Sequence, residues 1–158
     1  MLNRKNLLAI ITCVTIACVS ATGQADELNF RKIGQQMQGL PAKTISLRRA
    51  AYAVPLKYSG IRSRLTRKAD KLGVYVKEVS RGIGVIRKQP DNTKALYLAI
   101  RYSQTAERAA DELESLFNDL KKIADRDDND SLEKAARNYK KMADDVKDRM
   151  RRIVRELD

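Results

Sequence analysis

The sequence predicts an all-α protein, an antiparallel up-and-down helical bundle of three long heptad helices plus an N-terminal helical segment. Apolar residues recur every three or four positions along most of the chain, and no stretch keeps the two-residue alternation of a strand. Short polar breaks separate the periodic stretches, and short connections favour antiparallel neighbours. A third of the residues are charged and 5% are aromatic, so the core must be mainly aliphatic.

The clearest helix is predicted over residues 92–126. Its apolar stripe keeps the alternating spacing of four and three residues that is typical of a bundle helix. Asp91, after Gln89 and Pro90, is the expected N-cap. The stripe consists of Ala99, Ser103, Ala106, Ala110, Leu113, Phe117, Leu120 and Ala124.

A second helix is predicted over residues 131–157. Asp130 followed by Glu133 matches a capping box at its start, after the helix-breaking run 127–130. The predicted stripe consists of Leu132, Ala135, Tyr139, Met142, Val146, Met150, Ile153 and Leu157.

The third long helix ends at Lys88, before Gln89 and Pro90, but its start is ambiguous. Either one long helix kinks at Pro55, or residues 55–60 form a turn after a separate helix over residues 44–54. Farther upstream, Gly39 and Pro41 are expected to end a short helix that carries Phe30, Ile33, Met37 and Leu40. The long helix has the stripe Ile61, Leu65, Ala69, Leu72, Val76, Val79, Ile83 and Ile86, which Leu47, Ala51, Val54 and Tyr58 extend backward.

The first residues predict export. Arg4 and Lys5 precede an uncharged apolar run over residues 7–19 and then small residues, which is the order of a secretory signal peptide over residues 1–25. Cleavage is expected after Ala25 or after Ala21, because a run of 13 residues is shorter than the about 20 of a spanning helix. The single domain would then be residues 26–158, located in the periplasm or secreted.

Residues 15–18 resemble a bacterial lipobox, in which the cysteine is acylated, although Thr15 replaces the usual Leu. Acylation of Cys18 would make the chain a lipoprotein and tether it to a membrane. Cys13 and Cys18 are the two cysteines of the sequence, so ordinary cleavage would leave no disulfide.

Positive charge is concentrated in one segment. Residues 41–88 carry 13 Lys and Arg against Asp70 and Glu78, whereas residues 89–158 carry 15 bases and 16 acids. In one interpretation, the bases are neutralised by facing acids, because antiparallel pairing across the 88–91 turn would bring the two helices side by side. The bases expected to face the stretch with Glu107, Asp111, Glu112 and Glu114 are Arg62, Arg64, Arg67, Lys68 and Lys71. In the other, the excess binds an anionic partner. The candidate binding residues are Arg48, Arg49, Lys57, Arg64, Lys68, Lys71 and Arg81.

Residue types required for catalysis are missing. The sequence has no histidine, which is the commonest general base and metal ligand, and we expect neither an enzyme nor a cofactor. A calcium loop starting at Asp125 would have Asp130 where glycine is required and Ala136 where glutamate is required.

The leading hypothesis is a non-catalytic binding or scaffold protein whose basic helix contacts a protein or an anionic surface, such as lipid head groups or a cell-wall polymer. Export and sparse aromatic residues argue against nucleic acid. In size, charge and helicity, the chain is similar to small basic holdase-type chaperones of the periplasm. In general shape it is also similar to PsbQ-like extrinsic subunits of a membrane complex. The sequence leaves these alternatives and the oligomeric state open.

Overall fold

The computed structural model describes residues 30–158, which form an all-α bundle with no strand in that range. Residues 30–37 are helical, and then come α2 (Leu40–Ala53), the short 3-10 helix η1 (Leu56–Tyr58), α3 (Ser59–Lys88), α4 (Thr93–Arg126) and α5 (Asp130–Leu157). The predicted signal peptide, its cleavage sites and Cys18 lie outside the described residues.

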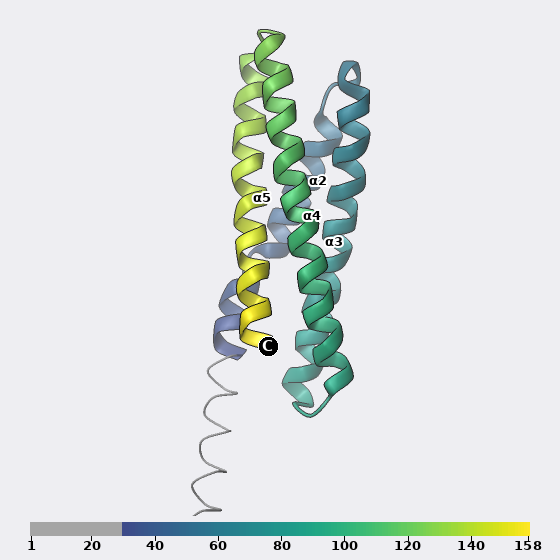
Figure 1. The fold of residues 1–158 in the computed structure, drawn as a ribbon, viewed down its shortest axis with the longest axis vertical. Helices are drawn as coiled ribbons and strands as arrows, with labels where there is room; N and C mark the ends of the chain where they lie inside the picture. The colour runs from purple at the N-terminus through teal and green to yellow at the C-terminus, as the bar shows by residue number, and fades with distance from the viewer. Residues whose placement is uncertain (1–29) are drawn as a thin grey trace, which may run out of the picture.

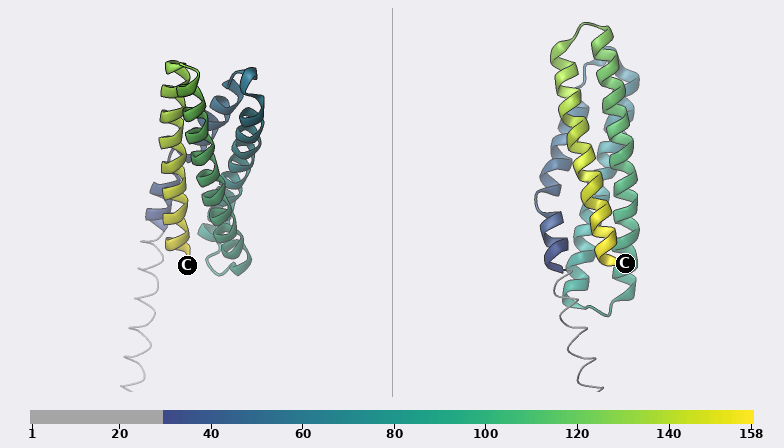
Figure 2. Two further views of the ribbon diagram at one scale, coloured as in Figure 1. Left: turned by 45° about the horizontal axis from the view of Figure 1, so that its top comes forward. Right: turned by 60° about the vertical axis from the view of Figure 1, so that its left-hand side comes forward.

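The three long helices run up and down beside one another, and α4 packs against both α3 and α5 (Figure 1). The short helix α2 crosses on the far side of the bundle and packs against α3 and α5. The turn between α3 and α4 extends beyond the C-terminal end of α5 (Figures 1 and 2). The predicted bundle of three long helices and an N-terminal helical segment is confirmed.

Pro55 separates two helices. Helix α2 ends at Ala53 and α3 begins at Ser59, with η1 between them, which selects the second of the two sequence interpretations. Proline lacks the N–H that a continuous helix would need at this position. Val54 and Tyr58 are nevertheless buried on either side of Pro55, so the apolar stripe crosses the break.

The N-terminal helical segment is divided at Gly39. Its φ of 75° is a left-handed conformation that glycine adopts at little cost, and Pro41 occupies the first turn of α2. The expected end of the short upstream helix is therefore confirmed, while α2 begins earlier than the predicted residue 44. The Nη1 of Arg149 donates hydrogen bonds to the carbonyl oxygens of Gln36 and Gln38, which holds the segment on α5.

Both predicted caps were wrong by one residue. Asn92, not Asp91, caps α4, because its side-chain oxygen accepts a hydrogen bond from the N–H of Ala95 at 3.0 Å. Asn129, not Asp130, caps α5 and accepts from the N–H of Leu132 at 3.1 Å. Asp130 instead lies in the first turn, where a carboxylate still stabilises the helix dipole.

The predicted stripe of α4 is confirmed at all eight positions, since each is buried. On α5 the predicted stripe is buried at Val146, Met150, Ile153 and Leu157 and only partly buried at Leu132, Ala135, Tyr139 and Met142. Ala136 and Ala143, which were not predicted, are buried instead. The two buried alanines each lie one residue after a predicted position of the stripe. Small side chains point inward there, and Met142 packs at the edge of the core.

The two long interfaces differ in their packing. Between α4 and α5, the rings of Phe117 and Tyr139 lie 5.7 Å apart. Between α3 and α4, a Cβ added at Gly82 would lie 3.0 Å from the Cβ of Ala99. Glycine at position 82 therefore permits a close approach of the α3 and α4 backbones that a larger residue would oppose.

Candidate anion-binding surface

Residues 41–88 contain the 13 bases that the sequence singled out, and five of them form ion pairs. Two of these pairs stay within the α2–α3 region, with distances of 2.7 Å for Arg48 to Asp70 and 2.9 Å for Arg81 to Glu78. The other three reach acids elsewhere: Lys43 to Asp145, Lys57 to Asp127 and Lys68 to Glu112.

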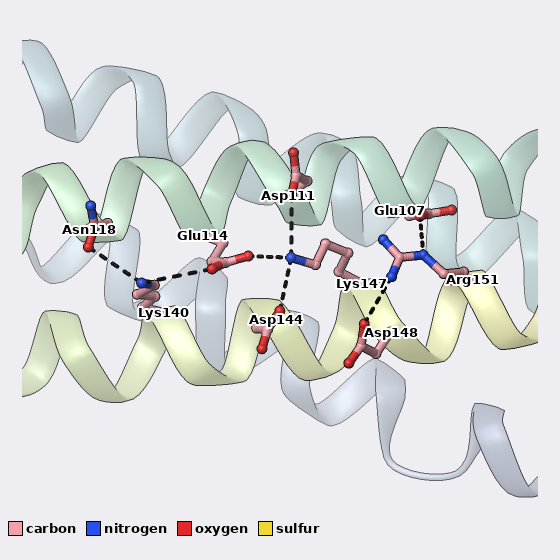
Figure 3. A network of polar contacts seen from close by, with 9 residues as sticks. All are labelled: Glu107, Asp111, Glu114, Asn118, Lys140, Asp144, Lys147, Asp148 and Arg151. Atoms are coloured by element: carbon pink, nitrogen blue, oxygen red, sulfur yellow. Dashed lines mark hydrogen bonds and ion pairs between the residues drawn. The ribbon is translucent and has the colours of Figure 1, made fainter.

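Helix α4 holds the acids that were expected to neutralise α3, but most of them turn toward α5 (Figure 3). Glu107 pairs with Arg151 at 2.9 Å, and Glu114 pairs with Lys147 at 2.5 Å and with Lys140 at 3.9 Å. Lys68 with Glu112 is the one ion pair between α3 and α4 within residues 30–158. The first interpretation is thus correct for Lys68. It is wrong for Arg62, Arg64, Arg67 and Lys71, which form no ion pair with the facing acids among residues 30–158.

Lys147 is the centre of the α4–α5 network (Figure 3). Its ammonium lies within 3.4 Å of one carboxylate oxygen from each of Asp111, Glu114 and Asp144, and its side chain is 15% exposed. Hydrogen bonds with Glu114 and Asp144 raise the pKa of Lys147 above its ordinary value. The lysine therefore stays charged and neutralises acids on both helices.

Eight bases of residues 41–88 take part in no ion pair within the described part of the chain. Three of them share a flank of α3 with Lys68, because positions 64, 67, 68 and 71 recur at helical spacing. We call Arg64, Arg67, Lys68 and Lys71 the basic flank. The eight are Arg49, Arg62, Arg64, Arg67, Lys71, Lys77, Arg87 and Lys88.

The basic flank borders a hollow of about 360 Å³ between α3 and α4. Arg64, Arg67 and Lys68 line its α3 side, and Glu112, Ser115 and Leu116 line its α4 side. Glu112 is already paired with Lys68, so Arg64 and Arg67 keep their guanidinium groups available. A phosphate or carboxylate could be held bidentately by such groups.

The seven candidate binding residues do not form one surface. Arg64 and Lys68 line the hollow, and Lys71 follows on the same flank. Arg48 and Arg81 instead line a groove between α2 and α3. Arg49 is exposed on α2, and Lys57 lies in η1, where its ammonium is 4.6 Å from the Tyr58 ring centroid.

Arg67 belongs to the basic flank but was missing from the predicted site residues. Its spacing of three from Arg64 and four from Lys71 could have indicated it. The sequence did not indicate which side of α3 would face α4, and hence which bases would be neutralised.

The acidic loop before α5 is hydrogen-bonded to η1 through Asp127. Asp127 accepts hydrogen bonds from the Tyr58 hydroxyl at 2.7 Å and from the Lys57 ammonium at 3.3 Å. These two bonds lower the pKa of Asp127 below its usual value. The contact ties η1, just before α3, to the loop that joins α4 and α5.

Among residues 30–158, no group of His, Cys, Asp and Glu has the arrangement of a metal site.

Comparison with known proteins leaves the bundle without an assigned relative: no family model, curated protein or solved structure matches the chain significantly. None of the helices described here combines the length and apolar character needed to cross a membrane.

Proposed function

We propose that this chain is a non-catalytic, exported binding protein that holds an anionic surface against the basic flank of α3. The observation that carries the proposal is the unequal use of the α4 acids. Bases of α5 form ion pairs with Glu107, Asp111 and Glu114, whereas a base of α3 pairs with Glu112 alone among these four acids. Positive charge consequently remains on the exposed side chains of Arg64, Arg67 and Lys71.

The arrangement of these cations supports an extended partner. They span two turns of one straight helix and face the same side, so they can contact neighbouring anionic groups together. Each Lys or Arg near an anionic membrane surface contributes about 1 kcal/mol to binding. Three such residues account for about a 100-fold change in affinity.

The test is the binding of the full-length chain to vesicles that contain anionic phospholipid. Replacing Arg64, Arg67 and Lys71 together by Gln should weaken binding at least about tenfold at roughly 0.1 M salt. The matched control replaces Lys134, Lys141 and Arg152, three exposed bases of α5 outside any described ion pair, by Gln. This control removes the same charge and should retain most of the binding.

Two results would overturn the proposal. Equal losses in the two triple variants would mean that net charge, not the basic flank, drives binding. Binding that does not weaken between low and high salt would exclude the electrostatic mechanism, because contacts between exposed charges are screened by salt.

Export is a separate part of the proposal and is supported by the order of charged, apolar and small residues in the first 25 positions. N-terminal sequencing of the protein recovered from its native compartment should begin at Asp26, or at Thr22 for the alternative cut. A chain that retains Met1 would contradict cleavage, and an acylated Cys18 would identify a lipoprotein.

A further inference from the structure

A second surface lies on the other side of α3, where a groove of about 540 Å³ runs between α2 and α3. Pro41 and Ile45 of α2 and Val74 and Val76 of α3 give it apolar walls. Ile45 is 51% exposed and Val74 is 57% exposed, which is unusual for aliphatic residues that lie at a helix interface. Ligand sites of about 300–1,000 Å³ are typically lined in this way.

Gly73 keeps the groove open. It lies among the lining residues, and a Cβ added there would meet no atom within 4 Å. Glycine in a helix interior costs up to about 1 kcal/mol relative to alanine. At this position no close contact requires that cost, whereas Gly82 on the same helix packs directly on Ala99. The missing side chain at position 73 therefore leaves room without serving the packing of the bundle.

The rim of the groove is cationic. Arg48, Lys77 and Arg81 line it, against a single acid, Asp70. Asp70 is only partly occupied: its Oδ2 accepts a hydrogen bond from the Tyr52 hydroxyl at 3.0 Å, while its Oδ1 lies 2.7 Å from the Nε of Arg48 without a hydrogen-bond partner. Lys77 forms no ion pair among residues 30–158, and Arg81 holds only the exposed i,i+3 contact with Glu78. An incoming anion would find Lys77 unpaired among these residues and would compete with Glu78 for the exposed guanidinium of Arg81.

We propose that this groove binds a monomeric anionic amphiphile, a long-chain carboxylate, with its acyl chain on the apolar walls and its head group at Lys77 and Arg81. Apolar walls favour the hydrocarbon, and a rim lined by three cations against one acid favours a negative head group over a positive one. A concave groove can enclose the acyl chain of one dissolved amphiphile, whereas a flat surface would suit a membrane. This site is separate from the basic flank and does not depend on the proposed function.

The first test uses a fluorescent long-chain fatty acid, titrated into the full-length protein below its critical micelle concentration. One saturable site is expected. Gly73→Leu should weaken its affinity at least about tenfold, because the new side chain fills the groove. Gly84→Leu is the matched control: it lies on the same helix, also has open space around it, is outside the groove and should bind as the unchanged protein does.

The second test concerns the head group. Lys77→Gln should weaken the fatty acid several-fold, and an amine-headed probe of equal chain length should bind about tenfold more weakly than the acid. Helix content from circular dichroism verifies that each variant folds, and leucine is a better helix former than glycine.

Four outcomes would each overturn the inference: absence of a saturable site, equal binding by Gly73→Leu, equal affinity for the amine probe, or binding to bilayers alone. A change in oligomeric state caused by Gly73→Leu would assign the groove to a second copy of the chain instead. A loss of vesicle binding through the basic flank would leave this result unaffected, so the two proposals fail independently.

Discussion

The two flanks of α4 differ in how many of their acids form ion pairs with the neighbouring helix. Toward α5, three acids of α4 form ion pairs with Lys140, Lys147 and Arg151 (Figure 3). Toward α3, Glu112 alone forms an ion pair across the interface within residues 30–158. A carboxylate of α4 that pairs with a base of α5 cannot also pair with a base of α3. The bases of α3 therefore keep most of their positive charge.

Loss of a core aromatic side chain at the α4–α5 interface should lower the free energy of unfolding more than any other change considered below. Phe117→Ala removes a ring that is 1% exposed and packs on Tyr139, and should lower the free energy of unfolding by about 3–5 kcal/mol. Tyr102→Ala, at the stacked Tyr75–Tyr102 pair between α3 and α4, should cost less because Tyr102 is only partly buried. Urea unfolding measures both, and an equal loss would contradict the difference between the interfaces.

Removal of the central lysine should have the next largest effect. Lys147→Met leaves Asp111, Glu114 and Asp144 without their shared cation and should lower the free energy of unfolding by about 2 kcal/mol. The matched variant Lys68→Met breaks a more exposed pair and should cost about 0.5 kcal/mol or less. Comparable losses in urea unfolding would show that the two flanks of α4 are energetically alike.

The glycines of α3 test how closely α3 and α4 approach. Gly84→Ala should raise the free energy of unfolding by about 0.5–1 kcal/mol, because alanine favours the helix and the added methyl meets open space. Gly82→Ala should gain less or become destabilising, since its methyl would lie 3.0 Å from the Cβ of Ala99. The same gain in both variants, measured by thermal unfolding, would rule out a tight contact at Gly82.

Acid should produce the smallest of these effects, through Asp145. Its partial burial alone would raise its pKa, but hydrogen bonds from Lys43 and Arg149 lower the pKa below the ordinary value. A carboxylate with a lowered folded-state pKa stabilises the protein above its unfolded pKa of about 3.9, and this contribution is lost as pH falls through the folded-state pKa. The unfolding temperature should therefore fall below about pH 4.

Asp145→Asn is the control for the acid effect. Asparagine carries no titratable group, so the variant should be less stable than the unchanged protein at pH 7 and approach it in acid. Thermal unfolding followed by circular dichroism at both pH values provides the measurement. A constant difference between the two proteins across this range would exclude titration of Asp145 as its cause.

Most of the fold could be predicted because helix periodicity is a local property. The eight predicted positions of α4 are all buried, and Pro55 and Gly39 end helices through backbone constraints that their own residue types impose. The prediction was wrong where neighbouring positions compete. Ala143 is buried and the more hydrophobic Met142 lies at the core edge, so hydrophobicity alone does not select the inward residue.

The binding surface could be predicted only in part. Arg64, Lys68 and Lys71 could be grouped from their spacing, but Arg48 and Arg81 line the opposite groove, which depends on where α2 crosses α3. The groove itself leaves no periodic signal in the sequence, because it arises from a short helix packed beside a longer one.

Sequence by itself determined the helices, their apolar faces and the segment that holds the excess positive charge, since these follow from residue type and spacing along the chain. Tertiary structure decided which helix neutralises the acids of α4, and hence which cations stay available, because an ion pair requires two side chains to meet across an interface. It also decided that Gly73 faces an open groove while Gly82 faces Ala99.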